Sequence, residues 1–371
     1  MEVSSITSWD GFLELESEWD DLLAQSDADP LFMSWTWLSC WVEIWRRALK
    51  PYVIVVRDNN NLIGVAPLYY SSFKLSGVLD YRVLRPVADL NCSGEYADFL
   101  TLTDNGVEIR RRILDFMVKD RSWDCIYLSR LRGWEGRPTV DAAKTVKGLR
   151  PRQRKRSFAV LNLPENVALL EEGYSRNLRK NLRRFENSLA GSKVEYIRCR
   201  TQAELEADLQ TLFDLHQRRW ASIGESGTFL RNPGIREFYR AFAHEALTRG
   251  WLRLVQVRVD DVPRAAQLGY QVGSTFYVIQ EGFDPDFKRG VGNLLRDWQL
   301  RACVADGLRV YDFLAGDSEH KRRWGPLVRE GYDLMMVRES LRTLPLLHSG
   351  WPGGRLLKTV LHEPVQQVPV E

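Results

Sequence analysis

The sequence predicts an α/β protein built from two copies of one structural unit. Its 371 residues, 44% of them hydrophobic, suffice for two or three domains with buried cores. The order strand, helix, strand occurs once in each half, and an apolar hairpin precedes it both times. We expect the copies at residues 1–150 and 151–345, followed by a C-terminal tail at residues 346–371.

In the first copy, apolar and alternating segments define the expected elements in order. The hairpin is expected at residues 51–70, in PYVIVVRDNNNLIGVAPLYY. A strand follows at residues 96–103, an amphipathic helix at residues 106–120 and a second strand at residues 123–131. These elements predict a sheet with a helix packed on it.

The second copy repeats this pattern. Its hairpin is expected at residues 251–272, its first strand at 274–283, its helix at 291–307 and its last strand at 308–314. The boundary between the copies falls in a basic stretch that begins with KGLRPRQRKR at residues 147–156. We interpret this stretch as a linker or the approach to a strand, since it has no aromatic residues for stacking on bases.

Charge is distributed unequally between the halves. Residues 1–146 carry 16 Lys and Arg against 22 Asp and Glu, whereas residues 147–371 carry 36 against 27. The second half is therefore expected to bind an anion.

Several other classes of protein are not indicated. The five cysteines contain no CxxC pair, so neither a disulfide framework nor a cysteine zinc site is expected. The acidic, amphipathic start does not resemble a signal peptide, and no apolar run approaches 18 residues, so we expect a cytoplasmic protein without a transmembrane segment. No HExxH pattern occurs among the five histidines, and no catalytic metal is expected. The tail could pack on the body or contact a membrane surface.

The loop before the second-copy helix is the first candidate binding site. Gly290, Val291, Gly292 and Asn293 open the helix, and glycines there let the backbone approach a ligand whose phosphates bind the free N–H groups. The alternative is a turn that merely ends the strand. The corresponding loop of the first copy, at residues 103–106, is acidic and has one glycine. No Walker A pattern occurs in the chain.

A basic helix is the second candidate. Ser175 is a suitable N-cap, and the helix that follows places leucines on one side and positive charges on the other. This face could be an ordinary solvated surface. Alternatively, it could bind donor phosphates, a nucleotide-linked acceptor or RNA, through Arg176, Arg179, Lys180 and Arg183.

Four segments together resemble a known family. They are residues 28–45, 174–189, 282–295 (GFDPDFKRGVGNLL) and 311–325 (YDFLAGDSEHKRRWG). Their order is similar to the GNAT acyltransferases, and within them to the double-GNAT, BioF2-like group. That group includes the CelD proteins of cellulose biosynthesis and is related to the FemAB peptidyltransferases.

The resemblance implies two tandem GNAT-like domains, each a mixed, mostly antiparallel sheet flanked by helices, with the first domain degenerate. It implies acyl-CoA, such as acetyl-CoA, as co-substrate, held by the loop amides with Arg289 supplying a positive charge. The acceptor would be an amine on an amino acid, a sugar or a polysaccharide precursor. Alternatives are a Fem-like enzyme that takes its acyl group from aminoacyl-tRNA, and an inactive scaffold of a polysaccharide-synthesis system.

Four residues are candidates for the chemistry of acyl transfer. His216 is either a structural histidine or a proton acceptor. Glu281, at the end of the strand before the glycine loop, is either a solvent-facing strand end or a base. Asp312 lies between apolar residues, so it forms a buried structural pair or acts as a base or acceptor anchor. Lys321 matches, by resemblance, the FemAB lysine that helps to stabilise the transferred carbonyl.

Overall fold

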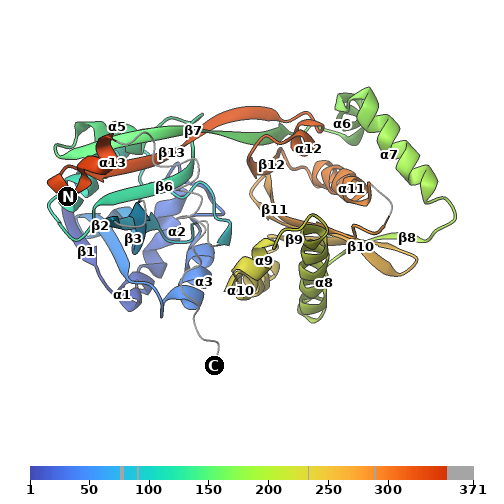
Figure 1. Ribbon diagram of the computed structural model, residues 1–371, viewed down its shortest axis with the longest axis horizontal. Helices are drawn as coiled ribbons and strands as arrows, with labels where there is room; N and C mark the ends of the chain where they lie inside the picture. Colours follow the sequence, from blue (N-terminus) through green and yellow to red (C-terminus); the bar gives the residue numbers. More distant parts are fainter. Residues whose placement is uncertain (76–78, 90–91, 233, 288–289, 349–371) are drawn as a thin grey trace. The chain divides into compact units, whose positions relative to one another are not determined.

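The computed structural model describes residues 1–75, 79–89, 92–232, 234–287 and 290–348 (Figure 1). The chain divides into two compact units, each of which is described by itself. Unit 1 contains residues 1–156 and the described residues from 330 onward, and unit 2 contains residues 157–329. The observed units thus differ from the expected division because residues 330–348 return to unit 1. Most of the tail expected at residues 346–371 lies outside the described residues.

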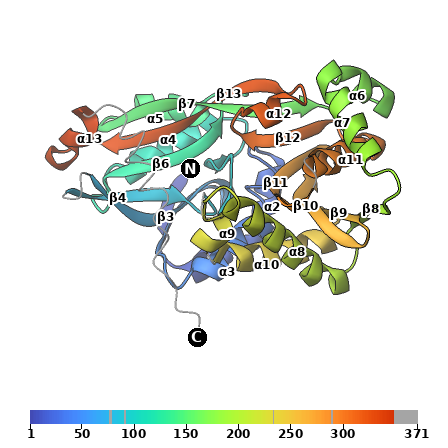
Figure 2. The ribbon, with the colours of Figure 1, turned by 45° about the vertical axis from the view of Figure 1, so that its right-hand side comes forward.

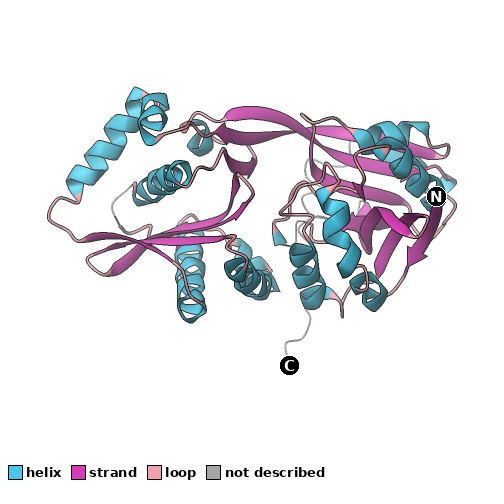
Figure 3. Cartoon of the chain, turned by 180° about the vertical axis from the view of Figure 1, so that it is seen from behind, coloured by secondary structure: helices cyan, strands magenta, loops and turns pink. Residues whose placement is uncertain are grey.

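Unit 1 is a mixed sheet flanked by helices (Figure 3). Its strands are β1 (Glu2–Ile6), β2 (Pro51–Asp58), β3 (Asn61–Leu75), β4 (Leu79–Pro86), β5 (Leu100–Thr101), β6 (Cys125–Arg132), the beginning of β7 (Leu149–Asn162) and most of β13 (Leu327–Arg338). Its helices are α1 (Trp9–Leu13), α2 (Glu16–Ala24), α3 (Trp35–Trp45), α4 (Gly106–Met117), α5 (Pro138–Thr145), the 3₁₀ helix η2 (Leu341–Thr343) and α13 (Leu344–His348). The strand order is β1-β2-β3-β4-β6-β13.

Unit 2 has the same construction. Its strands are the end of β7, β8 (Val194–Arg198), β9 (Leu252–Val259), β10 (Val262–Val272), β11 (Thr275–Phe283) and β12 (Val310–Ala315). Its helices are α6 (Val167–Gly173), α7 (Arg176–Ser188), α8 (Gln202–Ala221), α9 (Thr228–Arg231), α10 (Gly234–Thr248), α11 (Val291–Ala305) and α12 (Glu319–Arg322). The strand order is β8-β9-β10-β11-β12-β7.

The two strand orders correspond position by position, so the predicted α/β class and its duplication are confirmed. In unit 1, β4 pairs antiparallel with β3 and parallel with β6. In unit 2, β11 pairs antiparallel with β10 and parallel with β12. The last strand of each sheet is also antiparallel to its neighbour, since β13 pairs with β6 and β7 pairs with β12.

One predicted element of unit 1 is wrong in position. The segment at residues 96–103, expected to be a strand, contributes only the two-residue strand β5, which pairs with β3. The place between β3 and β6 is taken by β4, because the alternating sequence LDYRVLRP buries Tyr81, Val83 and Arg85 while it pairs with β3 along its whole length.

Helices cover both faces of the unit 2 sheet and position the candidate site. Figures 1 and 2 show α8 on one face of β9–β11 and α11 on the other. Gly282 of β11 permits the close approach of α8, because an added Cβ would lie 2.4 Å from the backbone nitrogen of His216. The leucines of α7 face inward and join the core formed by β9, β11 and α11. The start of α11 therefore lies beneath α7 and beside the end of β11.

Candidate active site

The loop before α11 has the geometry expected for close approach to a ligand. Gly290 is the N-cap of α11 and has φ +114°, a conformation that favours glycine. An added Cβ at Gly290 would lie 3.0 Å from the ring of Phe185 on α7. The amides of Val291 and Gly292 precede the first intrahelical bond, which Asn293 donates to Gly290. Arg289, expected to add a positive charge, lies outside the described residues.

A large pocket of about 900 Å³ opens on one side of this loop. Gly290 and Asn293 form part of its wall, α7 forms another part, and α12 with the residue that follows it forms a third. Its basic residues are Arg184 of α7, Arg322 of α12 and Arg323, which follows α12. An amide-rich helix start with arginines around it is suited to a phosphate-bearing ligand.

The predicted anion-binding residues of α7 lie on a different side of the helix. The residues of α7 that line the large pocket are Ser175, Asn177, Leu178, Asn181, Leu182, Arg184, Phe185 and Ser188. Arg176, Arg179, Lys180 and Arg183 are exposed, and none of them lines this pocket. Arg179 donates hydrogen bonds to the carbonyl oxygens of Glu171 (3.2 Å) and Glu172 (3.4 Å), at the end of α6. The pocket side of α7 is thus mainly amide and hydroxyl, with Arg184 as its cation.

A smaller pocket of about 190 Å³ lies on the other side of the loop. It also has Gly290 and Asn293 in its wall, and it extends to the end of β11. Glu281 lies in it and accepts hydrogen bonds from Gln267 Nε2 (2.6 Å) and from Nε and Nη2 of Arg296. Burial alone would raise the pKa of Glu281, but the charge and hydrogen bonds of Arg296 outweigh it and lower the pKa. Glu281 is therefore an ionised, firmly held carboxylate and a weak base.

Arg219 and His320 are residues of the small pocket that the sequence analysis did not single out. Arg219 reaches it from α8 and His320 from α12. Ser318 Oγ and His320 Nδ1 are 3.0 Å apart and share a hydrogen bond, which fixes the ring. Partial burial and the charge of Arg296 lower the pKa of His320 below its usual value, so its neutral form is present at pH 7. In the sequence they stand near the candidates His216 and Lys321, but no local pattern sets them apart from their neighbours.

Asp312 and Lys321 shape the end of β12. Asp312 is buried, and its Oδ1 accepts a hydrogen bond from the backbone nitrogen of Leu314 at 2.7 Å, across a bulge in the strand. Lys321 Nζ donates to the carbonyl oxygens of Phe313 (2.6 Å), Leu314 (3.3 Å) and Ala315 (2.7 Å). Both side chains thus bind the backbone of the bulge.

His216 lies in the packing layer between α8 and α9. Its ring is buried, with its centroid 4.5 Å from that of Phe229, and its Nε2 accepts a hydrogen bond from Trp220 Nε1 at 2.9 Å. Burial and the charge of Arg219 lower its pKa to about 4. This environment favours the structural interpretation of His216.

In unit 1 the corresponding helix is α4, and one of its own side chains fills the space at its start. Arg110 of α4 is buried and donates hydrogen bonds to Thr101, Thr139 and the carbonyl oxygen of Phe99. An added Cβ at Gly106, the first residue of α4, would lie 2.8 Å from Arg110 Nη1. The helix start of unit 1 is therefore occupied where that of unit 2 opens into two pockets.

The part of the chain that the structure describes shows no group of three or more side chains arranged to hold a metal ion. Within the same residues, no helix combines the length and the apolar composition needed to cross a bilayer.

Residues 176–322 match the family model of acetyltransferase (GNAT) domains, and this match supports an acyltransferase. No curated protein matches the chain by sequence.

Solved structures share the fold over most of the chain. FemX has 14% identity and a TM-score of 0.58, with 90% of this chain and 97% of that chain covered. The C-terminal DUF2156 domain of an Agrobacterium fabrum protein has 10% identity and a TM-score of 0.54, covering 90% and 94%. L-PGS from Bacillus licheniformis has 10% identity and a TM-score of 0.52, covering 89% and 93%. At these identities the likeness is one of fold.

Proposed function

We propose that the protein is an N-acyltransferase that moves an acyl group from acyl-CoA to the amine of a small acceptor. The observation that carries this proposal is that Gly290 and Asn293 belong to the walls of both pockets. A donor whose diphosphate lies on the amides of Val291 and Gly292 would have its nucleotide on the large-pocket side and its thioester near the small pocket. The large pocket has a volume typical of a cofactor site, roughly 300–1,000 Å³.

The residues of the small pocket fit the chemistry of the transfer. The acceptor nitrogen attacks the thioester carbonyl, the C–N bond forms, the C–S bond breaks, and the thiolate of coenzyme A leaves. The proton of the attacking amine passes to His320, which is neutral at pH 7. Glu281 and Arg296 form a fixed ion pair that positions the end of β11, and Asp312 and Lys321 position the end of β12.

Binding of acetyl-CoA tests the proposal. The ligand should raise the melting temperature of the full chain. At a ligand concentration about 100 times Kd, binding adds about 2.7 kcal/mol to the free energy of unfolding. Gly292→Asp should abolish this effect, because it places a side chain and a negative charge against the phosphates. An acidic residue in the first turn suits the helix itself, so the variant should fold.

Gly292→Ala is the matched control. Its Cβ would lie 3.5 Å from Phe283, an ordinary contact, and alanine is a better helix former than glycine. It should therefore keep acetyl-CoA binding. If acetyl-CoA stabilises neither the wild type nor Gly292→Ala, the acyl-CoA proposal is wrong.

The exposed side of α7 supports a second candidate, an aminoacyl-tRNA donor. Arg176, Lys180 and Arg183 are exposed on this side and lie outside both pockets, so a small ligand bound there does not require them. A row of exposed cations is suited to a phosphate backbone. The chain also shares its fold with FemX, which agrees with the Fem-like alternative.

Salt dependence of tRNA binding tests this candidate. In the triple variant Arg176→Gln, Lys180→Gln, Arg183→Gln, Arg179 is kept because it contacts α6. Each lost phosphate contact should reduce the slope of log K against log salt by about 0.7–0.9. An unchanged slope would exclude this side of α7 from RNA binding, whereas acetyl-CoA binding should be the same in the variant and the wild type.

A further inference from the structure

The small pocket is lined by two arginines, Arg219 and Arg296, and by two acids, Glu281 and Asp284, but the ion pairs of these acids do not include Arg219. Glu281 is paired with Arg296, and Asp284 is paired with both Arg218 and Arg264. Arg219 is the remaining cation. Within the described ranges, its guanidinium takes part in no hydrogen bond or ion pair of its own.

Arg219 is held in place by aromatic rings rather than by a counter-ion. Its guanidinium carbon lies 4.9 Å from the ring centroid of Phe283 and 5.7 Å from that of Trp220. The side chain is half-buried between α8 and β11, where removal from water costs free energy unless an anion or acceptor replaces the lost hydration. The donors of its planar fork are therefore available to a ligand in the small pocket.

The properties of the pocket limit what that ligand can be. Its volume of about 190 Å³ corresponds to about six water molecules, so it admits a small group. Arg219 supplies a single positive charge, and the carboxylate of Glu281 lies close enough to act on it electrostatically. Glu281 repels a dianion such as phosphate more strongly than a singly charged carboxylate, and a planar carboxylate matches the guanidinium in charge and shape.

We propose that Arg219 binds a carboxylate of the substrate in the small pocket, so that the enzyme prefers a reactant bearing one. The inference rests on the acyl-transfer function proposed above and adds the substrate class. The carboxylate could belong to the acyl group, as in a dicarboxylic acyl-CoA, or to the acceptor, as in an amino acid. Both sources present the same chemistry to Arg219.

Two experiments on the full chain distinguish the sources. In the donor experiment, titration calorimetry compares succinyl-CoA with butyryl-CoA, whose four-carbon acyl groups end in a carboxylate and a methyl group. In the acceptor experiment, release of coenzyme A from acetyl-CoA is measured with a mixture of amino acids and with the same amino acids as amides. In one of these two experiments the wild type should prefer the compound that bears the carboxylate by about tenfold or more. A factor of this size corresponds to the usual free energy of a charge-assisted hydrogen bond.

Arg219→Gln should remove that preference while leaving the affinity for acetyl-CoA unchanged, and Arg219→Lys should restore part of it. Arg218→Gln is the matched control, because Arg218 is the neighbouring arginine, lies outside the pocket lining and is paired with Asp284 and Asp286. It should keep the preference.

The inference is overturned if the wild type binds acetyl-CoA but prefers the carboxylate in neither experiment, or if Arg219→Gln retains the preference. Failure of the proposed function has a different signature. In that case acetyl-CoA binds neither the wild type nor Arg219→Gln, and both proposals fall together.

Discussion

At the scale of single residues, the small pocket contains two groups that could each act as the proton acceptor, Glu281 and His320. Glu281 is a carboxylate whose pKa is lowered by Arg296, and His320 is an imidazole whose pKa is lowered by burial and by the same arginine. A lowered pKa makes the carboxylate a poorer base, but it keeps the imidazole neutral and able to accept a proton. The same positive charge therefore favours His320 as the proton acceptor.

The pH dependence of kcat should report His320. In the proposed mechanism the neutral form accepts the proton, so the rate should fall as pH falls through the pKa of His320, which lies below 6.5. His320→Gln should lower kcat by about 100-fold or more and remove this acidic limb. Initial rates between pH 5 and 8 provide the measurement.

His216→Gln is the control for that profile. His216 is buried and hydrogen-bonded to Trp220, so its replacement should lower the melting temperature and leave the limb in place. A limb that survives in His320→Gln and disappears in His216→Gln would reverse the assignment.

The sequence could predict only part of this constellation. The glycines at 290 and 292 were recognisable because a helix start with glycines has a local meaning, and Glu281 was recognisable because it ends the adjacent strand. Arg219 and His320 lie about 100 residues apart on α8 and α12, and only tertiary packing brings them into one pocket. No local pattern distinguishes them from the neighbouring arginines and lysine.

At the scale of elements, the sequence pattern of α7 predicts where the helix begins and ends and which side is buried, but not which side faces the large pocket. Its limits follow from Ser175, whose side chain accepts a hydrogen bond from Leu178 N, and from Gly191, which has φ +92° just after the helix. The inward leucines were also predictable from their spacing. The sequence did not reveal that the flank carrying Asn177 and Asn181 faces the pocket, because charge was a stronger signal than amides.

Strand β4, by contrast, was not predicted from the sequence pattern. The segment at residues 96–103 has more apolar residues than LDYRVLRP, so the apolar pattern favoured a strand at residues 96–103 over one at β4. The side chain of Arg85 is buried in β4 because it pairs with Asp89, and a buried ion pair cannot be recognised from hydropathy. Tertiary pairing therefore overrode the pattern here.

At the scale of the whole molecule, the strand that completes each sheet is the one that follows the other unit's elements in the chain. The end of β7 follows the elements of unit 1 in the chain yet completes the sheet of unit 2, and β13 follows those of unit 2 yet completes the sheet of unit 1. A domain boundary placed near residue 150 from the sequence cannot describe this exchange, because the strand order depends on pairing between segments that are distant in the chain.

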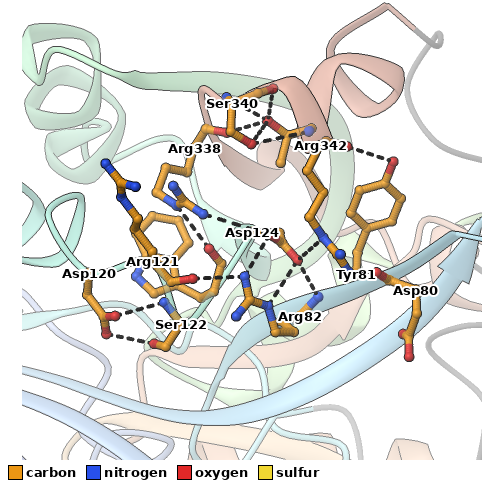
Figure 4. Close-up of polar contacts among 12 residues, drawn as sticks. Asp80, Tyr81, Arg82, Asp120, Arg121, Ser122, Asp124, Arg338, Ser340 and Arg342 are labelled. Atoms are coloured by element: carbon orange, nitrogen blue, oxygen red, sulfur yellow. Dashed lines mark hydrogen bonds and ion pairs between the residues drawn. The ribbon is translucent and has the colours of Figure 1, made fainter.

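A buried carboxylate fastens the returning segment to unit 1. Asp124 is fully buried, and Figure 4 shows Arg82, Arg338 and Arg342 directed at it. Arg82 approaches from β4, whereas Arg338 and Arg342 lie on the returning segment at β13 and η2. Burial alone would raise the pKa of Asp124, but the hydrogen bonds and charge of Arg82 and the charge of Arg342 outweigh it and lower the pKa. The carboxylate thus joins two parts of unit 1 that are far apart in sequence.

Replacing this carboxylate should loosen the returning segment. Asp124→Asn leaves three arginines without their shared partner and should cost about 2 kcal/mol, because they are partly exposed and can turn toward water. Since the folded-state pKa lies below the unfolded value of 3.8, the contribution of Asp124 is present above that pH and is lost as pH falls through the folded pKa. Urea unfolding from pH 7 to pH 3, with hydrogen exchange of residues 330–348, measures both effects.

The variant should unfold more readily at pH 7, exchange faster in residues 330–348, and depend less on pH below about pH 4 than the wild type. Asp141→Asn, the same substitution at an exposed pair with Lys144, should cost less than about 0.5 kcal/mol. Faster exchange throughout unit 1 in both variants would show a general loss of stability instead. Faster exchange confined to residues 330–348 in Asp124→Asn would identify the carboxylate as the point that keeps the exchanged strand in its sheet.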